Sequence, residues 1–235
     1  MAFIAEVIGT MAGFGAATIL TPFVALVLDI KTAIALVTVF HIFGTSARTL
    51  LFRRHIRWSL AVPFLATGLI GALIGASWAG NLSSAWLRLL FGAFVLAYVV
   101  LSATHPELRL PHTTGTVVGG GLMTGVIAGL IGTGGAIRAT VLSAFPLEKN
   151  AYLGTSAVIA VFTDATRLPV YLRHGWLTGD YLGLLTALVG VAFAGAWVGR
   201  RLVTHIPAKP FRWFVLTVLA LMGVKLLMEG WGAWR

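Results

Sequence analysis

The chain has 235 residues, of which 58% are hydrophobic and only 10% are charged, and its mean hydropathy is +0.94. Because soluble domains carry about 25% charged residues, this composition excludes a soluble protein and indicates a polytopic helical membrane protein. The net charge of +10 would favour nucleic-acid binding in a soluble protein. In a membrane protein, lysines and arginines in cytoplasmic loops explain it, and no nucleic-acid partner is expected. The chain has no cysteine, which excludes disulfides.

Eight apolar helical segments follow one another along the chain. They cover about residues 3–28, 32–52, 58–79, 87–103, 116–145, 151–172, 181–198 and 213–228. The first lacks a basic leader and a cleavage site, so we interpret it as a membrane segment and not as a removed signal peptide. The longest polar stretch is a short loop, which predicts a first membrane repeat at 1–104, a linker at 105–114 and a second repeat at 115–235.

The two halves share one register. Gly132 lies 119 positions after Gly13, and the same offset relates further pairs: Gly134 to Gly15, Arg167 to Arg48, Arg173 to Arg54, His174 to His55, Gly190 to Gly71 and Gly199 to Gly80. Two pseudo-symmetric halves of four segments each are therefore expected. Such duplication is a common transporter architecture, with the binding site at the interface between the repeats.

Loop charges favour inverted repeats over parallel ones. With eight crossings, six loop lysines and arginines lie on one side and seven on the other. If segments 1 and 5 are re-entrant hairpins, the distribution becomes four against nine, which is a usable positive-inside bias. The 30 residues at 116–145 would also measure about 45 Å as one straight helix, against roughly 30 Å of hydrocarbon. The hairpin interpretation places both termini outside, with each arm reaching about mid-membrane; tilted, kinked crossings in parallel halves are the alternative.

Glycines interrupt the first segment of each half. The breaks are Gly13-Phe14-Gly15 and Gly132-Thr133-Gly134-Gly135. Broken helices are tolerated in membranes where they line a buried cavity. A helix that begins after a break directs unpaired N–H groups and a positive dipole end at the gap, which makes an anion site. The hydroxyls of Thr18, Thr133 and Thr140 would add donors. Close helix packing is the alternative role for these glycines.

Five ionisable side chains inside apolar segments are candidates for function, because charges there are costly and usually mark a substrate or ion pathway. They are Arg48, Arg138, Arg167, His41 and Asp164. We expect the arginines to contact substrate, and His41 and Asp164 are candidates for proton coupling. Each has a structural alternative: Arg48 can snorkel to the interface, Asp164 and Arg167 can pair at i, i+3, and His41 can be a hydrogen-bonded core residue.

Small and hydroxyl residues mark further positions. Thr155-Ser156 follows Gly154 early in segment 6, where the hydroxyls can contact substrate or bond back to their own helix. The glycine ladders of segments 3 and 7 are expected to serve close helix packing; they are Gly68, Gly71 and Gly75, and Gly190, Gly195 and Gly199. No metal site and no cofactor are expected.

The chain resembles the TauE/SafE sulfite exporter family of small membrane permeases. The resemblance rests on the glycine break that opens each half, on Gly154-Thr155-Ser156, on the basic segment exits at 51–55 and 171–175, and on the start of segment 4 at 87–92. It implies a transporter of small sulfur-containing anions, such as sulfite or organosulfonates, in a bacterial inner membrane. It also implies that an ion gradient drives transport.

We therefore expect a secondary transporter that binds a small anion between the two breaks, with a proton as the candidate coupling ion and the lipid bilayer as its surroundings. The alternatives are an anion channel, a non-transporting sensor or assembly subunit, and an intramembrane enzyme. An enzyme is disfavoured because Ser156, Asp164 and His41 or His174 are the only triad-like residues, and neither Gly-x-Ser-x-Gly nor His-Glu-x-x-His occurs.

Overall fold

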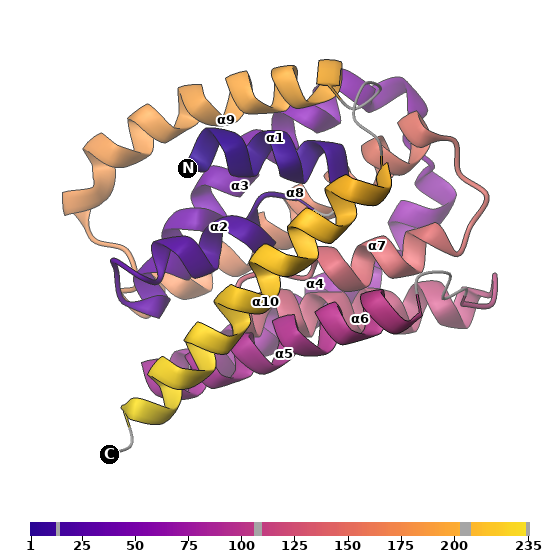
Figure 1. Ribbon diagram of the computed structural model, residues 1–235. Helices are drawn as coiled ribbons and strands as arrows, with labels where there is room; N and C mark the ends of the chain where they lie inside the picture. The colour runs from indigo at the N-terminus through magenta and orange to yellow at the C-terminus, as the bar shows by residue number, and fades with distance from the viewer. Residues whose placement is uncertain (13–14, 106–109, 203–207, 234–235) are drawn as a thin grey trace.

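A computed structural model describes residues 1–12, 15–105, 110–202 and 208–233 of the chain. This described part contains ten α-helices and two short 3₁₀ turns, and no strand (Figure 1). The helices are α1 Ala2–Ala12, α2 Ala17–Val24, α3 Ile30–Phe52, α4 Trp58–Asn81, α5 Ser84–Thr104, α6 Thr114–Ile131, α7 Gly135–Ser143, α8 Lys149–Arg173, α9 Leu182–Leu202 and α10 Ala208–Gly232. The 3₁₀ turns are Arg53–His55 and Gly179–Tyr181. The helix bounds follow the predicted apolar segments closely, with segments 1 and 5 each divided in two.

Polar residues in the loops fix several helix starts. Asp29 accepts a hydrogen bond from the Lys31 amide at 2.9 Å and caps α3. The Ser83 hydroxyl caps α5 and the Thr113 hydroxyl caps α6 in the same way. These side chains satisfy amides that have no partner within the helix, so each cap ends a loop at a defined residue.

Six of the described helices are long and apolar enough to cross a membrane, namely α3, α4, α5, α6, α9 and α10. This differs from the eight segments expected from the sequence. The first segment is divided into α1 and α2, of 11 and 8 residues, each too short to span. Helix α8 has 25 residues but is too polar for this set, because it carries Asp164, Arg167 and several hydroxyls. It lies inside the bundle, where those groups find protein partners.

Both divided segments fold back on themselves. In the second, a methyl group at Gly134 would meet the Thr124 carbonyl, and one at Gly120 would meet the Val141 side chain, so α7 returns along α6. In the first, the Gly15 amide donates to the Gly9 carbonyl at 3.2 Å. The arms are unequal, however. Helix α6 has 18 residues, about 27 Å, so this arm is longer than the half-membrane length expected.

The helices are layered around a central pair. Helices α3 and α8 pack against each other; α9 packs on α3, and α4 packs on α8. The first arm of each hairpin packs on one of these helices, α1 against α9 and α6 against α4 (Figure 1). Helix α10 packs on α5 and also contacts α2. The central pair therefore lies between the two hairpins and is positioned to carry a site shared by them.

The closest helix packing joins α4 and α6. A methyl group at Gly71 would overlap the Leu122 carbonyl, and one at Gly125 would overlap the Gly68 carbonyl. Glycines on both helices therefore let the two backbones touch, as the ladder in segment 3 predicts. The ladder prediction is wrong at Gly190 in α9, where a methyl group would meet nothing within 4 Å.

Candidate functional site

The two hairpin tips meet inside the protein. The hydroxyl of Thr18, in the second residue of α2, and that of Thr133, in the second break, are 2.6 Å apart, and both side chains are buried. One hydroxyl donates to the other, and the accepting hydroxyl keeps its own proton for another partner. Gly13 and Phe14, the first two predicted residues of the first break, lie outside the described residues.

Two glycines with positive φ shape the breaks. Gly132 has φ +83° and ends α6 in the left-handed conformation, which glycine adopts without steric cost. Gly15 has φ +93°, and a methyl group there would collide with Nε2 of His41. The absence of a side chain at Gly15 therefore lets the imidazole of α3 reach the first break.

His41 links the first break to the second. Its Nδ1 lies 2.7 Å from Oδ2 of Asp164 on α8, and its Nε2 is buried without a hydrogen-bond partner among the described residues. Oδ1 of Asp164 accepts from Nε and Nη2 of Arg167, at 3.0 and 2.8 Å. Nη2 of Arg167 also donates to the Gly132 carbonyl at 2.9 Å. A continuous buried chain of contacts therefore runs from Gly15 to Gly132.

Arg167 holds the end of α6. Its Nη1 donates to the Ala128 carbonyl at 2.6 Å, and the Tyr171 hydroxyl donates to the Gly129 carbonyl at 2.5 Å. These carbonyls belong to the last turn of α6, where positive charge is favourable, and the Ala128 carbonyl also accepts from the Gly132 amide at 2.9 Å. The pairing of Asp164 with Arg167 expected from their spacing is confirmed. Sequence reasoning missed Tyr171, whose signal is its position one turn beyond Arg167.

Arg48 occupies the matching position in the first half. Its Nη1 donates to the Gly9 carbonyl near the end of α1, at 3.4 Å. Gly9 precedes Ala128 by the same 119 positions that separate Arg48 from Arg167. The side chain is only 3% exposed, so the alternative that it snorkels to the interface is wrong. Its Nη2 is buried and has no hydrogen-bond partner among the described residues.

Arg48 points inward because a carboxylate lies beside it. Glu6 of α1 is fully buried, and its Oε1 is 3.5 Å from Nε of Arg48. Our sequence prediction of site residues did not include Glu6. The signal that would have found it is the same one used for Asp164, an acidic residue within an apolar segment.

The remaining predicted residues lie around α7 and the start of α8. Nε of Arg138 donates to the Ser156 hydroxyl at 3.0 Å, and both side chains are buried. This contact fixes α7 to α8 near the second break. Thr155 points elsewhere, because its hydroxyl accepts from the Arg57 amide at 2.9 Å and so secures the loop before α4. Gly134 and Gly135 form the start of α7.

Buried charge at this interface is unbalanced. Among the described residues, three arginines and two carboxylates are buried, namely Arg48, Arg138, Arg167, Glu6 and Asp164. Isolated charge is costly away from water, and an excess of positive charge is offset most directly by a bound anion. The arrangement can therefore bind a small anion with arginine, imidazole, hydroxyl and helix N-terminal donors.

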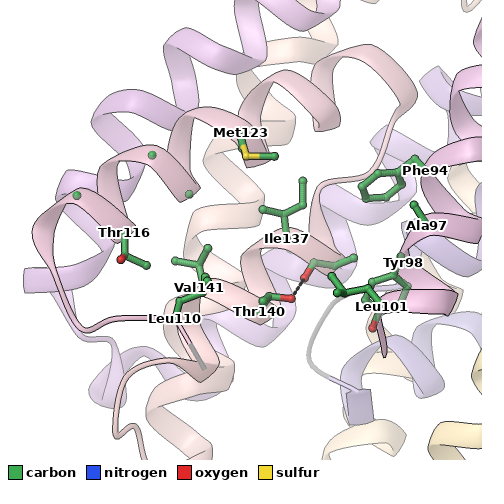
Figure 2. Close-up of a pocket in the computed structure, with 14 residues that line it drawn as sticks. Phe94, Ala97, Tyr98, Leu101, Leu110, Thr116, Met123, Ile137, Thr140 and Val141 are labelled. Carbon is green, nitrogen blue, oxygen red and sulfur yellow. Dashed lines mark hydrogen bonds between the residues drawn. The ribbon is translucent and has the colours of Figure 1, made fainter. Parts of the chain in front are cut away.

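A separate cavity of about 460 Å³ lies between α5, α6 and α7 (Figure 2). Its walls are mainly apolar side chains, including Phe94, Leu101, Met123 and Ile137. Thr140 lines it but donates its hydroxyl to the Ala136 carbonyl of its own helix. Of the predicted anion donors the cavity contains only Thr140, so the expectation that this hydroxyl joins the other two at the breaks is not met. It lies against α7 and leaves room beside the second hairpin.

Comparisons with known proteins agree on the kind of protein. The model of the sulfite exporter TauE/SafE family matches residues 1–226. A probable inner membrane transporter protein, TsaS of Comamonas testosteroni, is 25% identical over 181 residues, 76% of this chain and 75% of that protein. A UPF0756 membrane protein of Geobacillus thermodenitrificans is 37% identical over 117 residues, 43% of this chain and 76% of that protein. No solved structure matches significantly.

Proposed function

Because the chain belongs to the TauE/SafE sulfite exporter family, whose members are multi-pass membrane transporters and not enzymes, we propose that it is a secondary transporter of small sulfur-containing anions. Sulfite and simple organosulfonates are the candidate substrates. The anion binds between the two glycine breaks, at the contact of Thr18 with Thr133.

The meeting of the hairpin tips carries this proposal. Thr18 and Thr133 are 115 positions apart in the chain, yet their hydroxyls touch in a buried place. Hydroxyl pairs of this kind can open to donate two hydrogen bonds to an oxyanion. Helix α7 begins beside them and contacts α2. Its first intrahelical bond is donated by the Arg138 amide, so the amides of 135–137 precede it and remain available to an anion.

Unpartnered nitrogen atoms supply further donors. Nε2 of His41 faces the first break at Gly15. Nη2 of Arg48 is buried and has no hydrogen-bond partner among the described residues. A neutral imidazole whose Nδ1–H bonds to Asp164 has an acceptor at Nε2, whereas a protonated one has a donor there. We therefore propose that His41 donates to the anion when it is protonated, with Asp164 stabilising the charged ring. This makes His41 and Asp164 candidates for proton coupling.

The architecture proposed for the cycle is a pair of inverted repeats, residues 1–104 and 115–235, joined by the linker at 105–114. The packing supports the equivalence of the two halves, because α1 contacts α9 as α6 contacts α4, and α3 contacts α9 as α8 contacts α4; the loop charges favour the inverted arrangement. Helices α1, α3 and α4 of the first half thus correspond to α6, α8 and α9 of the second half, and each contact has its counterpart. Alternating access then moves one half against the other around the fixed site.

The test is flux of labelled sulfite and methanesulfonate into proteoliposomes, with and without an imposed pH gradient. We expect saturable flux in the wild type and a loss of about tenfold in Thr18→Val and in Thr133→Val, since a hydrogen bond to a charged group contributes about 1.5–3 kcal/mol. Thr140→Val is the matched control, because its hydroxyl bonds within α7, and it should transport normally.

Two results would change the proposal. Equal loss in all three threonine variants would remove the site from the hairpin tips. Flux that never saturates and ignores the gradient would favour an anion channel, the second candidate, which the same excess of buried positive charge supports.

A further inference from the structure

Glu6 is a buried carboxylate that the proposed site does not use. It lies midway along α1 with its side chain fully buried. Thr10, one turn later, donates to its Oε1 at 3.3 Å, and Arg48 approaches the same oxygen at 3.5 Å. The second oxygen, Oε2, is buried with no hydrogen-bond partner among the described residues.

Asp164 shows what a fully paired buried carboxylate looks like in this protein. Its Oδ1 accepts two bonds from Arg167, and its Oδ2 is held by His41. Every strong acceptor position faces a donor, as a buried charge requires. Glu6 has only long contacts on one oxygen and none on the other. A neutral carboxylic acid fits this environment better than a fully charged carboxylate, because it needs fewer donors.

The surroundings of Glu6 leave Arg48 as its electrostatic partner. Helix α3 presents Arg48 and Gly44, and a methyl group at Gly44 would lie 2.6 Å from the Glu6 carboxyl atoms. Helix α9 places Gly195 against Cβ and Cγ of Glu6. The two arginines in the last turn of α9 are engaged elsewhere, Arg200 over the ring of Phe52 and Arg201 over the ring of Trp197. Helix α2 contains no titratable residue. Among the described residues, then, the charge of Glu6 acts mainly on Arg48.

We propose that Glu6 is a proton-binding site of the transport cycle, which takes up a proton at Oε2 and thereby frees Arg48 to bind the substrate anion. The inference rests on the transport function proposed above. The proton comes from the aqueous phase and converts the carboxylate to a neutral acid, so one negative charge beside Arg48 is lost. The buried interface then has three arginines facing one carboxylate, and an anion replaces the lost negative charge. Proton and anion are bound together and move in the same direction.

The deciding measurement is the number of protons carried per anion. Proteoliposomes with a pH-sensitive dye inside report protons while labelled sulfite or methanesulfonate reports the anion. In Glu6→Gln, which imitates the protonated acid, we expect exchange of labelled anion at a rate close to wild type, with one proton fewer carried per anion. Glu229→Gln is the matched control, since Glu229 is a partly exposed carboxylate of α10 paired with Lys225 and Arg88; it should keep the wild-type ratio. An unchanged ratio in Glu6→Gln would overturn the inference and leave the transport function standing.

A second measurement needs no substrate. Infrared spectra of wild-type protein with carbon-13 glutamate should contain a buried protonated carboxyl band that disappears as the pH is raised. The band should be absent from folded Glu6→Gln and present in Glu229→Gln. If no buried glutamate band titrates in the wild type, Glu6 does not exchange protons and the inference fails. If the band titrates but neither anion moves, the substrate class fails and the proton site stands.

Discussion

The two hairpins are held by equivalent arginines in very different ways. Arg167 makes contacts of 2.6–3.0 Å to Asp164, Ala128 and Gly132. Arg48 contacts Gly9, Gly44 and Glu6 only at 3.4–3.5 Å. Its Nη2 has no hydrogen-bond partner among the described residues. The packing differs in the same direction, because α6 touches α4 backbone to backbone through glycines on both helices, whereas α1 meets α9 mainly through its side chains.

This difference suggests that the two equivalent hairpins have different roles in transport, one staying in place and the other moving. Short charge-assisted hydrogen bonds and close backbone packing resist motion, so the second hairpin is suited to be the fixed wall of the site. Long contacts and an unpartnered guanidinium nitrogen cost little to rearrange, so the first hairpin is suited to be the responsive wall. The predictions below test this asymmetry, beginning with the largest expected effect.

Replacing Arg167 should mainly lower stability, whereas replacing Arg48 should mainly lower transport. Arg167→Ala removes the cation beside the buried Asp164 and a donor to the Gly132 carbonyl, and we expect it to lower the free energy of unfolding by about 3–5 kcal/mol. Arg48→Ala should cost less, about 1–3 kcal/mol, because its contacts are long, yet it should reduce anion flux strongly. Denaturant unfolding in detergent and proteoliposome flux measure the two effects.

Conservative variants control for this comparison. Arg167→Lys keeps the charge but lacks the fork that contacts Asp164 and two carbonyls together, so it should fall between wild type and Arg167→Ala. Equal loss of stability in Arg48→Ala and Arg167→Ala would contradict the division into a fixed and a responsive hairpin.

Glycine-to-alanine substitutions at the α6–α4 and α1–α9 interfaces should show how differently the two hairpins are packed. Gly125→Ala would place a methyl group against the Gly68 carbonyl, which is backbone and cannot give way. We expect a loss of about 1–3 kcal/mol from overpacking. In Gly199→Ala, the nearest atoms are Cβ of Thr10 at 2.8 Å and the Val7 carbonyl at 3.0 Å, so the overlap is smaller than at Gly125 and the loss should lie at the lower end of that range. Thermal unfolding of both variants in one detergent compares them, and a larger loss at Gly199 would show that α1 is the more rigid arm.

The smallest expected effect is a gain on the open face of α6. A methyl group at Gly119 would meet nothing within 4 Å, and Gly119 lies beside the apolar cavity of Figure 2. Gly119→Ala should therefore stabilise α6 by about 0.5–1 kcal/mol, because alanine loses less backbone entropy than glycine in a helix. Anion flux should not change, since the cavity holds none of the proposed substrate contacts. A loss of flux in this variant would mean that the second hairpin must move into the cavity.

The sequence predicted the elements better than the arrangement of charges. Long apolar runs have one low-energy conformation in a membrane, and side-chain caps define where a helix starts, so the bounds of helices such as α3 and α5 follow from local pattern. The breaks at Gly15 and Gly132 were equally readable, because positive φ is expected only at glycine. The polar helix α8 was recognised as a segment, although its composition keeps it out of the set of apolar spans. The missed residues, Glu6 and Tyr171, have roles that depend on partners 42 positions away, namely Arg48 and the Gly129 carbonyl.

By itself, the sequence determined a helical membrane protein with two interrupted segments and with arginines in equivalent positions, since hydropathy and glycine placement act locally. Tertiary structure decided which charges meet. It paired Asp164 with both His41 and Arg167, turned Arg48 inward to Glu6, and brought Thr18 against Thr133. The physical reason is that a buried charge takes the partners that packing places within hydrogen-bond distance. Spacing along one helix shows only the partners on that helix.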